Sequence, residues 1–434
     1  MRLKLVVALG ALALAPTFGF CQDVNKLIKQ DDVERIIKTL SADDMEGRGT
    51  FTKGIDKAAT FIEGEFKAAG LKPFMGNTGF RQNFSMVRTT PVSAKITLNG
   101  VDLPAERVIV SASSSFNWAS ADGVEVIKIG PDKNFISEFQ GLMAGDKKAI
   151  VLVDTSASKM FARVVNFTKR GSTTFKTVGA GNKQLVFILG PYTDVKSLTV
   201  NYEATVKEQP LFNVVGVIPG KSKPNEYVVF GGHYDHLGIV KKGAEQDTIA
   251  NGADDDASGT TAVITLAKYY KKLNNNERTL VFVAFTAEEI GGFGSQYFSK
   301  QLDPDKVVTL FNIEMIGKAA KFGENSAFIT GFERSDFGTI LQKNLEGTAF
   351  KFYPDPYPEQ NLFYRSDNAT LAALGVPAHT ISTDQIPTDK FYHTVKDEYA
   401  TLDVNNIVAT IRAIALSSRS IVAGKDTPTR IPKR

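Results

Sequence analysis

The chain has 434 residues, of which 43% are hydrophobic and 23% are charged, and its formal net charge is +4. Such a composition is ordinary for a folded globular protein with a large core, and it excludes the strongly basic pattern of a nucleic-acid-binding protein. Because a single core seldom grows beyond about 250–300 residues, the length favours two domains.

Residues 1–21 have the layout of a secretory signal peptide. Two basic residues, Arg2 and Lys4, precede an apolar stretch that is shorter than the roughly 20 residues needed to span a membrane. A buried first helix is the alternative, and Phe20 argues against lipidation of Cys21 as an anchor. We therefore expect cleavage after Cys21 and an exported protein, periplasmic or extracellular. It would have no stable membrane span and no cysteine, and its net charge would be +2 because both basic residues are lost.

Hydrophobic patterning divides the rest of the chain into two domains. Residues 33–40 and 54–70 have apolar side chains at helical spacing, and beyond residue 207 predicted strands alternate with helices. Between them, short β-rich runs are separated by polar connections, and no histidine occurs before His233. We predict a discontinuous α/β domain (22–90 and 207–423), an inserted, mainly β domain without chemistry of its own (91–206), and a flexible tail (424–434).

The second half of the chain predicts the layers of the α/β domain. Residues 279–285 and 307–313 are almost wholly apolar, as in strands of a mostly parallel sheet that are buried on both faces. Residues 258–273 have the periodicity of an amphipathic helix, and Asp403 is a suitable N-cap for a closing helix. We therefore expect an α/β fold with a mixed, mostly parallel sheet sandwiched by helices.

Carboxylates and imidazoles follow several of these strands, at the positions where sites form in open α/β sheets. The residues concerned are His233, Asp235, Asp254, Asp255, Asp256, Glu288, Glu289 and Glu314, with His393 further along the chain. Each has an ordinary explanation by itself, because aspartates cap helices and a lone histidine is more often a surface or core residue. Together, so many carboxylates at one rim would repel one another unless a cation neutralised them, which favours a metal site.

Imidazole and carboxylate ligands without thiolate are typical of catalytic zinc. A pair of ions about 3.5–4 Å apart needs one bridging carboxylate and about two further ligands for each ion. Five residues meet this requirement: Asp254 as the bridge, Glu289 and His393 on one ion, and His233 and Glu314 on the other.

The remaining polar residues receive roles beside the ions. Glu288 is expected to be the general base, because it lies next to a ligand and is not needed as one. Asp235 is expected to accept the second ring N–H of His233 and so to orient that ring. His236 is interpreted as a loop residue near the rim, and His379 as structural.

Five motifs in order resemble the M28 family of zinc peptidases: GGHYDHLG (231–238), NGADDDASG (251–259), TAEEIGGFGS (286–295), FNIEMIG (311–317) and FYHTVKDE (391–398). The resemblance covers most of the chain, and the insertion lies where many members carry a protease-associated domain. It implies two co-catalytic zinc ions with the ligands above, and a cis peptide bond between Asp254 and Asp255. Glu314 replaces a more frequent aspartate and Asn368 a frequent histidine, so the second metal and the pocket can differ from those of the family.

The resemblance implies an exported exopeptidase, and first of all an aminopeptidase that hydrolyses N-terminal residues from peptides. In this scheme the two zinc ions activate a water, and Glu288 takes its proton and returns it to the leaving amine. Tyr364 or Tyr392 would stabilise the oxyanion. A glutaminyl cyclase with one zinc and a carboxypeptidase or dipeptidase are alternatives on the same fold, and a non-catalytic binding module is a third.

Overall fold

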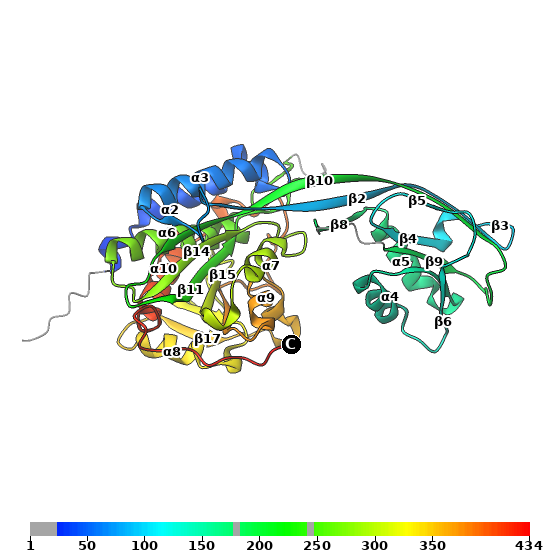
Figure 1. The fold of residues 1–434 in the computed structure, drawn as a ribbon. Coiled ribbons are helices and arrows are strands. Elements are labelled where there is room, and N and C mark those ends of the chain that lie inside the picture. The colour runs from blue at the N-terminus through cyan, green and yellow to red at the C-terminus, as the bar shows by residue number, and fades with distance from the viewer. Residues whose placement is uncertain (1–23, 177–182, 241–246) are drawn as a thin grey trace, which may run out of the picture. The chain divides into compact units, whose positions relative to one another are not determined.

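The computed structural model describes residues 24–176, 183–240 and 247–434, so the predicted signal peptide lies outside the described residues (Figure 1). Among the described residues, no helix combines the length and apolarity that crossing a membrane requires. The chain forms two compact units: unit 1 comprises Met1–Arg81 and Asn213–Arg434, and unit 2 comprises Gln82–Phe212. The predicted boundaries at 91 and 207 fall inside two long strands, β2 (Arg81–Leu98) and β10 (Leu198–Ile218), whose continuous β pattern hides the change of unit.

Unit 1 is built on a mixed sheet whose central strands are parallel. The order is β17 (Lys351–Pro354), β16 (Ser326–Ile329), β18 (Ala378–Ser382), β15 (Val307–Ile313), β11 (Lys223–His233), β14 (Arg278–Phe285) and β10, with β1 (Lys72–Pro73) also paired to β10. Neighbouring strands from β18 to β14 are parallel, while β16 runs antiparallel to β18 and β10 antiparallel to β14. The predicted mixed, mostly parallel sheet is therefore confirmed, and β11 lies near its centre.

Helices cover this sheet on both faces (Figure 1). One set comprises α2 (Gln30–Leu40), α3 (Lys53–Ala69), α6 (Gly259–Leu273), α8 (Phe337–Asn344) and α10 (Val404–Ser417), and the other comprises α7 (Phe293–Lys300) and α9 (Asn368–Ala373). Side chains of β11 alternate between the two layers, as the period of two in a strand requires. Phe230 packs against Tyr270 of α6, whereas its neighbour Val229 belongs to a core cluster with Phe298 of α7 and Leu371 of α9.

The ends of two helices follow signals in the sequence. α3 ends at Gly70, whose φ of 77° is the left-handed conformation that favours glycine after a helix. At the start of α10, the Asp403 carboxylate accepts hydrogen bonds from the backbone N–H groups of Asn405 and Asn406. The predicted cap at Asp403 is confirmed, and α10 leads the chain away from the loop that carries His393.

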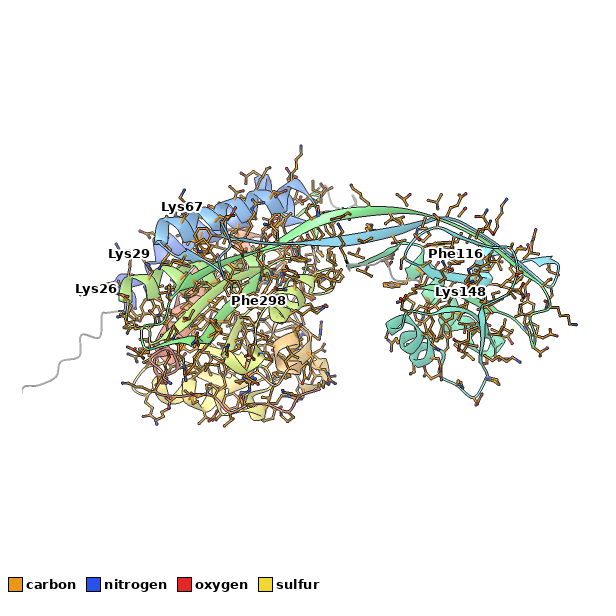
Figure 2. The ribbon with its side chains drawn as sticks, in the orientation of Figure 1. Lys26, Lys29, Lys67, Phe116, Lys148 and Phe298 are labelled. Carbon is orange, nitrogen blue, oxygen red and sulfur yellow. The ribbon has the colours of Figure 1, made fainter. Side chains whose placement is uncertain are left out.

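Unit 2 contains a second sheet and two helices. The strand order is β4 (Val108–Ala112), β9 (Gln184–Leu189), β7 (Lys148–Val153) and β6 (Glu125–Ile129), and the helices are α4 (Phe135–Ala144) and α5 (Ser158–Thr168). One core cluster lies between the sheet and the helices, and the other surrounds Trp118, whose ring centroid lies 5.0 Å from that of Phe116 and 5.4 Å from Lys148 Nζ. Figure 2 labels Phe116 and Lys148 in this unit. Strands predominate in this unit, as predicted, but the two helices were not expected.

The C-terminal segment 424–434 is packed against unit 1, contrary to the prediction of a flexible tail. Ile431 is buried in the same core cluster as Val229. Arg430 Nη1 donates to the carbonyl oxygen of Val307 at 2.8 Å, and the backbone N–H of Thr429 donates to Asp336 Oδ1 at 2.7 Å. One apolar residue among polar ones is a weak sequence signal, and the contacts that hold this segment are distant in the sequence.

Candidate active site

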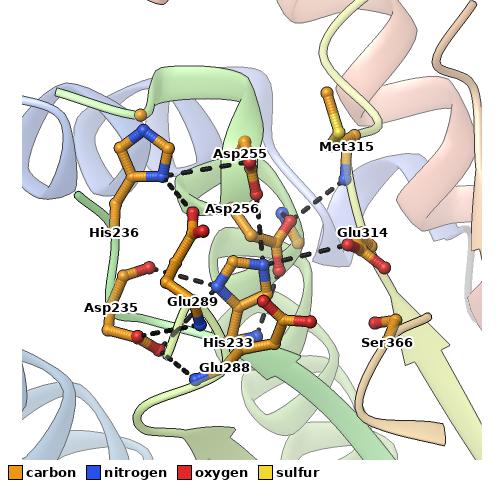
Figure 3. Close-up of polar contacts among 12 residues, drawn as sticks. His233, Asp235, His236, Asp255, Asp256, Glu288, Glu289, Glu314, Met315 and Ser366 are labelled. Carbon is orange, nitrogen blue, oxygen red and sulfur yellow. Dashed lines mark hydrogen bonds and ion pairs between the residues drawn. The ribbon is translucent and has the colours of Figure 1, made fainter. Parts of the chain in front are cut away.

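The predicted site residues gather at one edge of the sheet of unit 1. Because β18, β15, β11 and β14 are parallel neighbours, their carboxyl ends meet at this edge. His233 is the last residue of β11, Glu314 directly follows β15, and Glu288 and Glu289 follow β14 after a short turn (Figure 3). His393 reaches the same place from the loop between β18 and α10.

Asp255 lies between the two predicted ligand histidines. Its Oδ1 is 3.1 Å from His233 Nε2, and its Oδ2 is 3.2 Å from His393 Nε2. Glu314 Oε1 lies 3.9 Å from His233 Nε2, and Glu289 Oε2 lies 3.2 Å from His393 Nε2. Asp255 therefore faces one histidine and one glutamate on each side, which is the position of a bridging carboxylate.

The structure does not bring Asp254, the predicted bridge, into this cluster. Its Oδ1 accepts the backbone N–H of Gly317 at 2.7 Å, and its Oδ2 lies 3.2 Å from Lys318 Nζ. The cis peptide bond also lies one residue later than expected, between Asp255 and Asp256. Three consecutive aspartates have the same chemistry, and the irregular backbone of η4 (Ala253–Ser258) decides which of them faces the histidines.

Two further aspartates hold the cluster together through backbone amides. Asp256 accepts hydrogen bonds from the N–H groups of His233, Gly259 and Met315, at 3.0 to 3.2 Å, and so connects the ends of β11 and β15 with the start of α6. Asp397 accepts the N–H groups of Asp254 and Asp255. These carboxylates fix the backbone that carries Asp255, and neither received a role from the sequence alone.

Asp235 supports the site differently from the prediction. His233 Nδ1 lies 3.1 Å from the backbone carbonyl oxygen of Asp235, whereas the nearest carboxylate oxygen of Asp235 is 3.9 Å away. The carboxylate instead accepts the N–H groups of Glu288 and Glu289 at 3.1 and 3.3 Å (Figure 3), and it also accepts the Thr50 hydroxyl at 3.0 Å. Asp235 therefore orients the histidine through its main chain and the two glutamates through its side chain.

Glu288 has the environment of a general base. Its side chain lines the pocket beside the cluster. Burial raises the pKa of Glu288 well above its usual value, and the nearby carboxylates of Glu314 and Asp367 raise it further. A carboxylate with a raised pKa is a better proton acceptor near neutral pH than an ordinary glutamate.

The imidazoles of the cluster favour the charged form of the carboxyl groups of Asp255 and Glu289. Burial raises the pKa of Asp255, but His233 and His393 lower it well below its usual range. Burial likewise raises the pKa of Glu289, but the imidazoles of His236 and His393 lower it to about 2. Asp255 and Glu289 are consequently carboxylates at neutral pH, which is the form that binds metal.

Several buried polar atoms of the cluster have no hydrogen-bond partner among the described residues. They include His233 Nε2, His236 Nδ1 and Glu289 Oε1. Leaving such a group unpaired costs about 1–3 kcal/mol. The residues form two groups, His233 with Asp255 and Glu314, and His236 with Asp255 and Glu289. Within each group the candidate ligand atoms lie within 4.8 Å of one another. The unpaired atoms and the imidazole–carboxylate donor set both fit metal ions.

A pocket with apolar walls opens beside the cluster. Its walls include Met315, Phe328, Leu362 and Ile386, and Arg365 and Tyr392 also line it. The Tyr392 ring stacks on that of His393, with 3.9 Å between centroids. Tyr364 does not line this pocket and contacts neighbouring hollows, with the Arg434 guanidinium 4.3 Å from its ring centroid. Tyr392 lines the same pocket as the cluster, whereas Tyr364 shares a neighbouring hollow with Glu288.

The remaining histidines differ in their surroundings. His236 lies at the rim, as interpreted, but it is 2% exposed and belongs to the cluster, in which it had been given no role. His379 lies apart from the cluster, where Nδ1–H donates to the Thr330 carbonyl oxygen at 2.9 Å and Nε2 accepts from the Ser335 hydroxyl at 2.7 Å. Asn368 is buried and donates to the carbonyl oxygens of Phe363 and Ala378, so it holds backbone and does not line the pocket.

Arg48 is a buried support that the sequence pattern did not reveal. Its guanidinium donates to the carbonyl oxygens of Leu40, Tyr234, Asn251 and Gly252, at 2.5 to 2.9 Å. It thereby ties the loop before α3 to the segments that carry His236 and Asp255. A fully buried arginine is rare unless it is paired, but three of its four partners lie 186 to 204 residues away in sequence.

The part of the chain that carries the cluster is similar to known peptidases. Residues 213–417 match the model of Peptidase family M28. The chain is 27% identical to leucine aminopeptidase 1 of Paracoccidioides brasiliensis over 273 residues, which cover 58% of this chain and 68% of that protein. It is 28% identical to leucine aminopeptidase 2 of Trichophyton equinum over 285 residues, which cover 58% of this chain and 56% of that protein.

Solved structures share the fold. The aminopeptidase from Aneurinibacillus sp. strain AM-1 has a TM-score of 0.53 at 18% identity, and the match covers 94% of this chain and 96% of that one. A zinc aminopeptidase from Bacillus subtilis has a TM-score of 0.53 at 16% identity, covering 91% of this chain and 95% of that one.

Proposed function

The chain belongs to peptidase family M28, and from this premise we propose that it is an exported aminopeptidase that works with two zinc ions. Membership of the family makes it a metallopeptidase with peptide substrates. The observation that carries the two-ion proposal is the position of Asp255, whose two carboxylate oxygens each face a different histidine. In this proposal, His233 and Glu314 hold one ion with Asp255, and Glu289 and His393 hold the other.

The residues of the chain supply the proton transfers. Two zinc ions, when bound, lower the pKa of water and polarise the scissile carbonyl group. Glu288 accepts the proton of the attacking water and then delivers it to the nitrogen of the leaving amine. Its raised pKa suits both steps, because the protonated carboxyl group is then readily formed.

Tyr392 is the candidate donor to the developing oxyanion. Burial raises the pKa of Tyr392 and the acids Asp255 and Glu314 raise it further, so its hydroxyl stays protonated and can donate. Its stacking on His393 holds the ring beside the cluster. Tyr364 is not assigned this role.

The charge of the pocket supports action on chain ends. Five carboxylates, those of Asp255, Glu288, Glu289, Glu314 and Asp384, line the pocket, and the two that are not proposed as ligands, Glu288 and Asp384, can accept hydrogen bonds from the α-amine of a peptide. The apolar walls are suited to the side chain of the first residue. An N-terminus is therefore favoured over an internal bond, which has no ammonium group to place there.

A peptide panel read by mass spectrometry tests this proposal. We expect stepwise loss of N-terminal residues from unblocked peptides, and no reaction with N-acetylated copies of the same sequences. A chelator should abolish the reaction and added zinc should restore it. Loss of C-terminal residues, or loss of ammonia from an N-terminal glutamine without hydrolysis, would contradict the assignment as an aminopeptidase.

Export has a separate test. Residues 1–21 resemble a signal peptide, with cleavage proposed between Cys21 and Gln22. The mature protein, recovered from outside the cytoplasm, should begin at Gln22. A chain that keeps residues 1–21, or one that carries a lipid on Cys21, would contradict this part of the proposal.

A further inference from the structure

His236 occupies a fixed position in the cluster that neither the predicted metal ligands nor the general base explains. Its backbone N–H donates to the carbonyl oxygen of Arg48 at 3.3 Å, and its ring lies against Gly252. A Cβ atom at Gly252 would come within 2.5 Å of Cγ and Cδ2 of the ring, so the absence of a side chain there makes room for the imidazole. The surroundings therefore set the direction of the ring.

The ring nitrogen Nδ1 of His236 is close to two carboxylates. It lies 2.8 Å from Glu289 Oε1 and 3.9 Å from Asp255 Oδ2. Although 2.8 Å is short enough for a hydrogen bond, neither Nδ1 nor Glu289 Oε1 has a hydrogen-bond partner of acceptable angle among the described residues. The two atoms are therefore close together without a hydrogen bond between them, as two ligands of one ion can be.

We propose that His236 is a ligand, through Nδ1, of the ion held by Asp255, Glu289 and His393. Zinc lies about 2.0–2.2 Å from nitrogen and oxygen ligands, so two ligands of one ion can be at most about 4.4 Å apart. The contacts of 2.8, 3.2 and 3.9 Å within this group all meet that limit. The rings of His236 and His393 lie on the same side of the cluster, inclined at 70° with centroids 5.9 Å apart, and His236, Asp255 and Glu289 form a group whose ligand atoms lie within 4.8 Å of one another.

This assignment makes the two ions unequal, and it rests on the proposed two-ion centre. One ion has four protein ligands, His236, Asp255, Glu289 and His393, whereas the other has three, His233, Asp255 and Glu314. Zinc sites with four protein ligands are closed, and sites with three keep a position for water or substrate. The four-ligand site should therefore fill first, and the three-ligand site should be the one that exchanges a ligand with substrate.

Nitrogen NMR of the whole protein tests the assignment directly. The chain has only four histidines, so protein labelled with ¹⁵N-histidine and loaded with ¹¹³Cd gives a simple spectrum. We expect scalar coupling to cadmium at Nε2 of His233, at Nε2 of His393 and at Nδ1 of His236. His379 should be uncoupled and provides the internal reference, because both its ring nitrogens have protein partners.

The outcomes separate this inference from the proposed function. Coupling at His233 and His393 with none at His236 would overturn the inference and leave the two-ion centre in place. Absence of coupling at every histidine would instead contradict the metal centre itself. The spectrum of the unaltered protein suffices for both results, and His236→Gln serves to assign the His236 signal.

Metal affinity provides a second measurement. In competition with a chelator, the wild-type protein should release two zinc ions with unequal dissociation constants. His236→Gln should weaken binding of the tighter zinc ion by more than about 100-fold. Loss of a hydrogen bond to a ligand, by comparison, costs about 10–100-fold in metal affinity. The weaker constant should change less. Equal effects on both ions, or an unchanged tight constant in a folded variant, would contradict His236 as a ligand.

Discussion

Both units of this protein contain parallel strands followed by acidic residues, yet the acids behave differently in the two. In unit 2, Asp154 follows β7 and its Oδ1 accepts the backbone N–H of Ser156 at 2.8 Å. That hydrogen bond lowers the pKa of Asp154. In unit 1, Glu289 follows β14, and its Oε1 is buried with no hydrogen-bond partner among the described residues. Both positions look alike in the sequence, as a carboxylate after an apolar strand.

This difference shows what distinguishes a site from an ordinary strand end. An acid that caps a turn is satisfied by the backbone, and nothing else is needed to stabilise it. A group of buried acids and imidazoles that is not satisfied internally requires a further partner, and here the chemistry of the group fits metal. Substitutions in the two units should therefore differ strongly in their effects on metal binding and hydrolysis.

The largest effect should come from Asp255→Asn. Because each carboxylate oxygen of Asp255 faces a different histidine, the variant should lose zinc from both positions and hydrolysis should fall below detection. Asp254→Asn is the control at the neighbouring residue. This variant should be less stable because it loses the contact with Lys318, but it should still bind both ions. Elemental analysis of the purified variants measures this, and equal metal loss from the two would refute the central position of Asp255.

Glu288→Gln should affect catalysis and leave metal binding intact. Since the amide cannot accept the proton of water, kcat should fall by about 10²–10⁴-fold, the usual contribution of a general base. Zinc content should remain that of the wild type, because Glu288 is not among the proposed ligands. Glu333→Gln, at an exposed glutamate, is the control and should keep full activity. A kcat for the Glu288 variant within tenfold of the wild type would show that another group is the base.

His379 provides a satisfied histidine in the same unit, for comparison with those of the cluster. Burial lowers the pKa of His379 from 6.5 to about 4. The unfolded chain therefore binds this proton more tightly, so the stability gained from neutral His379 is present above pH 6.5 and is lost as the pH falls towards 4. The loss amounts to roughly 3 kcal/mol. The difference in unfolding free energy between wild type and His379→Gln should shrink over this range, and a constant difference would contradict the assignment.

The smallest effect should come from Asp154→Ala in unit 2. The substitution removes one partly exposed hydrogen bond to Ser156, so the thermal stability of unit 2 should fall slightly. Peptide hydrolysis and zinc content should not change. Metal loss or reduced turnover in this variant would mean that Asp154 contributes to the site and is not merely a turn cap.

The sequence was sufficient for the site residues that directly follow apolar strands. The runs before His233, Glu288, Glu289 and Glu314 end visibly, and parallel strands place these ends together. It was not sufficient for Asp255, because three successive aspartates differ only in the local backbone. Nor did it place His236, whose environment depends on the close approach of Gly252 and Arg48 from distant segments.

In the fold, too, the features predicted correctly are those with a local sequence signal. Long apolar runs and helix caps revealed the sheet and helices of unit 1, because those signals are local. The helices α4 and α5 of unit 2 were not predicted, although α5 is as long as α2, because they lie among β-rich runs separated by polar connections. The packing of the C-terminal segment depends on contacts of Arg430 and Ile431 with residues distant in the sequence, which no local pattern records.

Anomalous diffraction from crystals of the zinc-loaded protein tests the central claim most directly. Data collected on both sides of the zinc absorption edge should show two peaks that share Asp255. One should lie beside His233 and Glu314, and the other beside Glu289, His393 and His236. A single peak, or a peak at the separate acidic group of Asp254, Asp384 and Asp389 in place of these two, would contradict the two-ion centre.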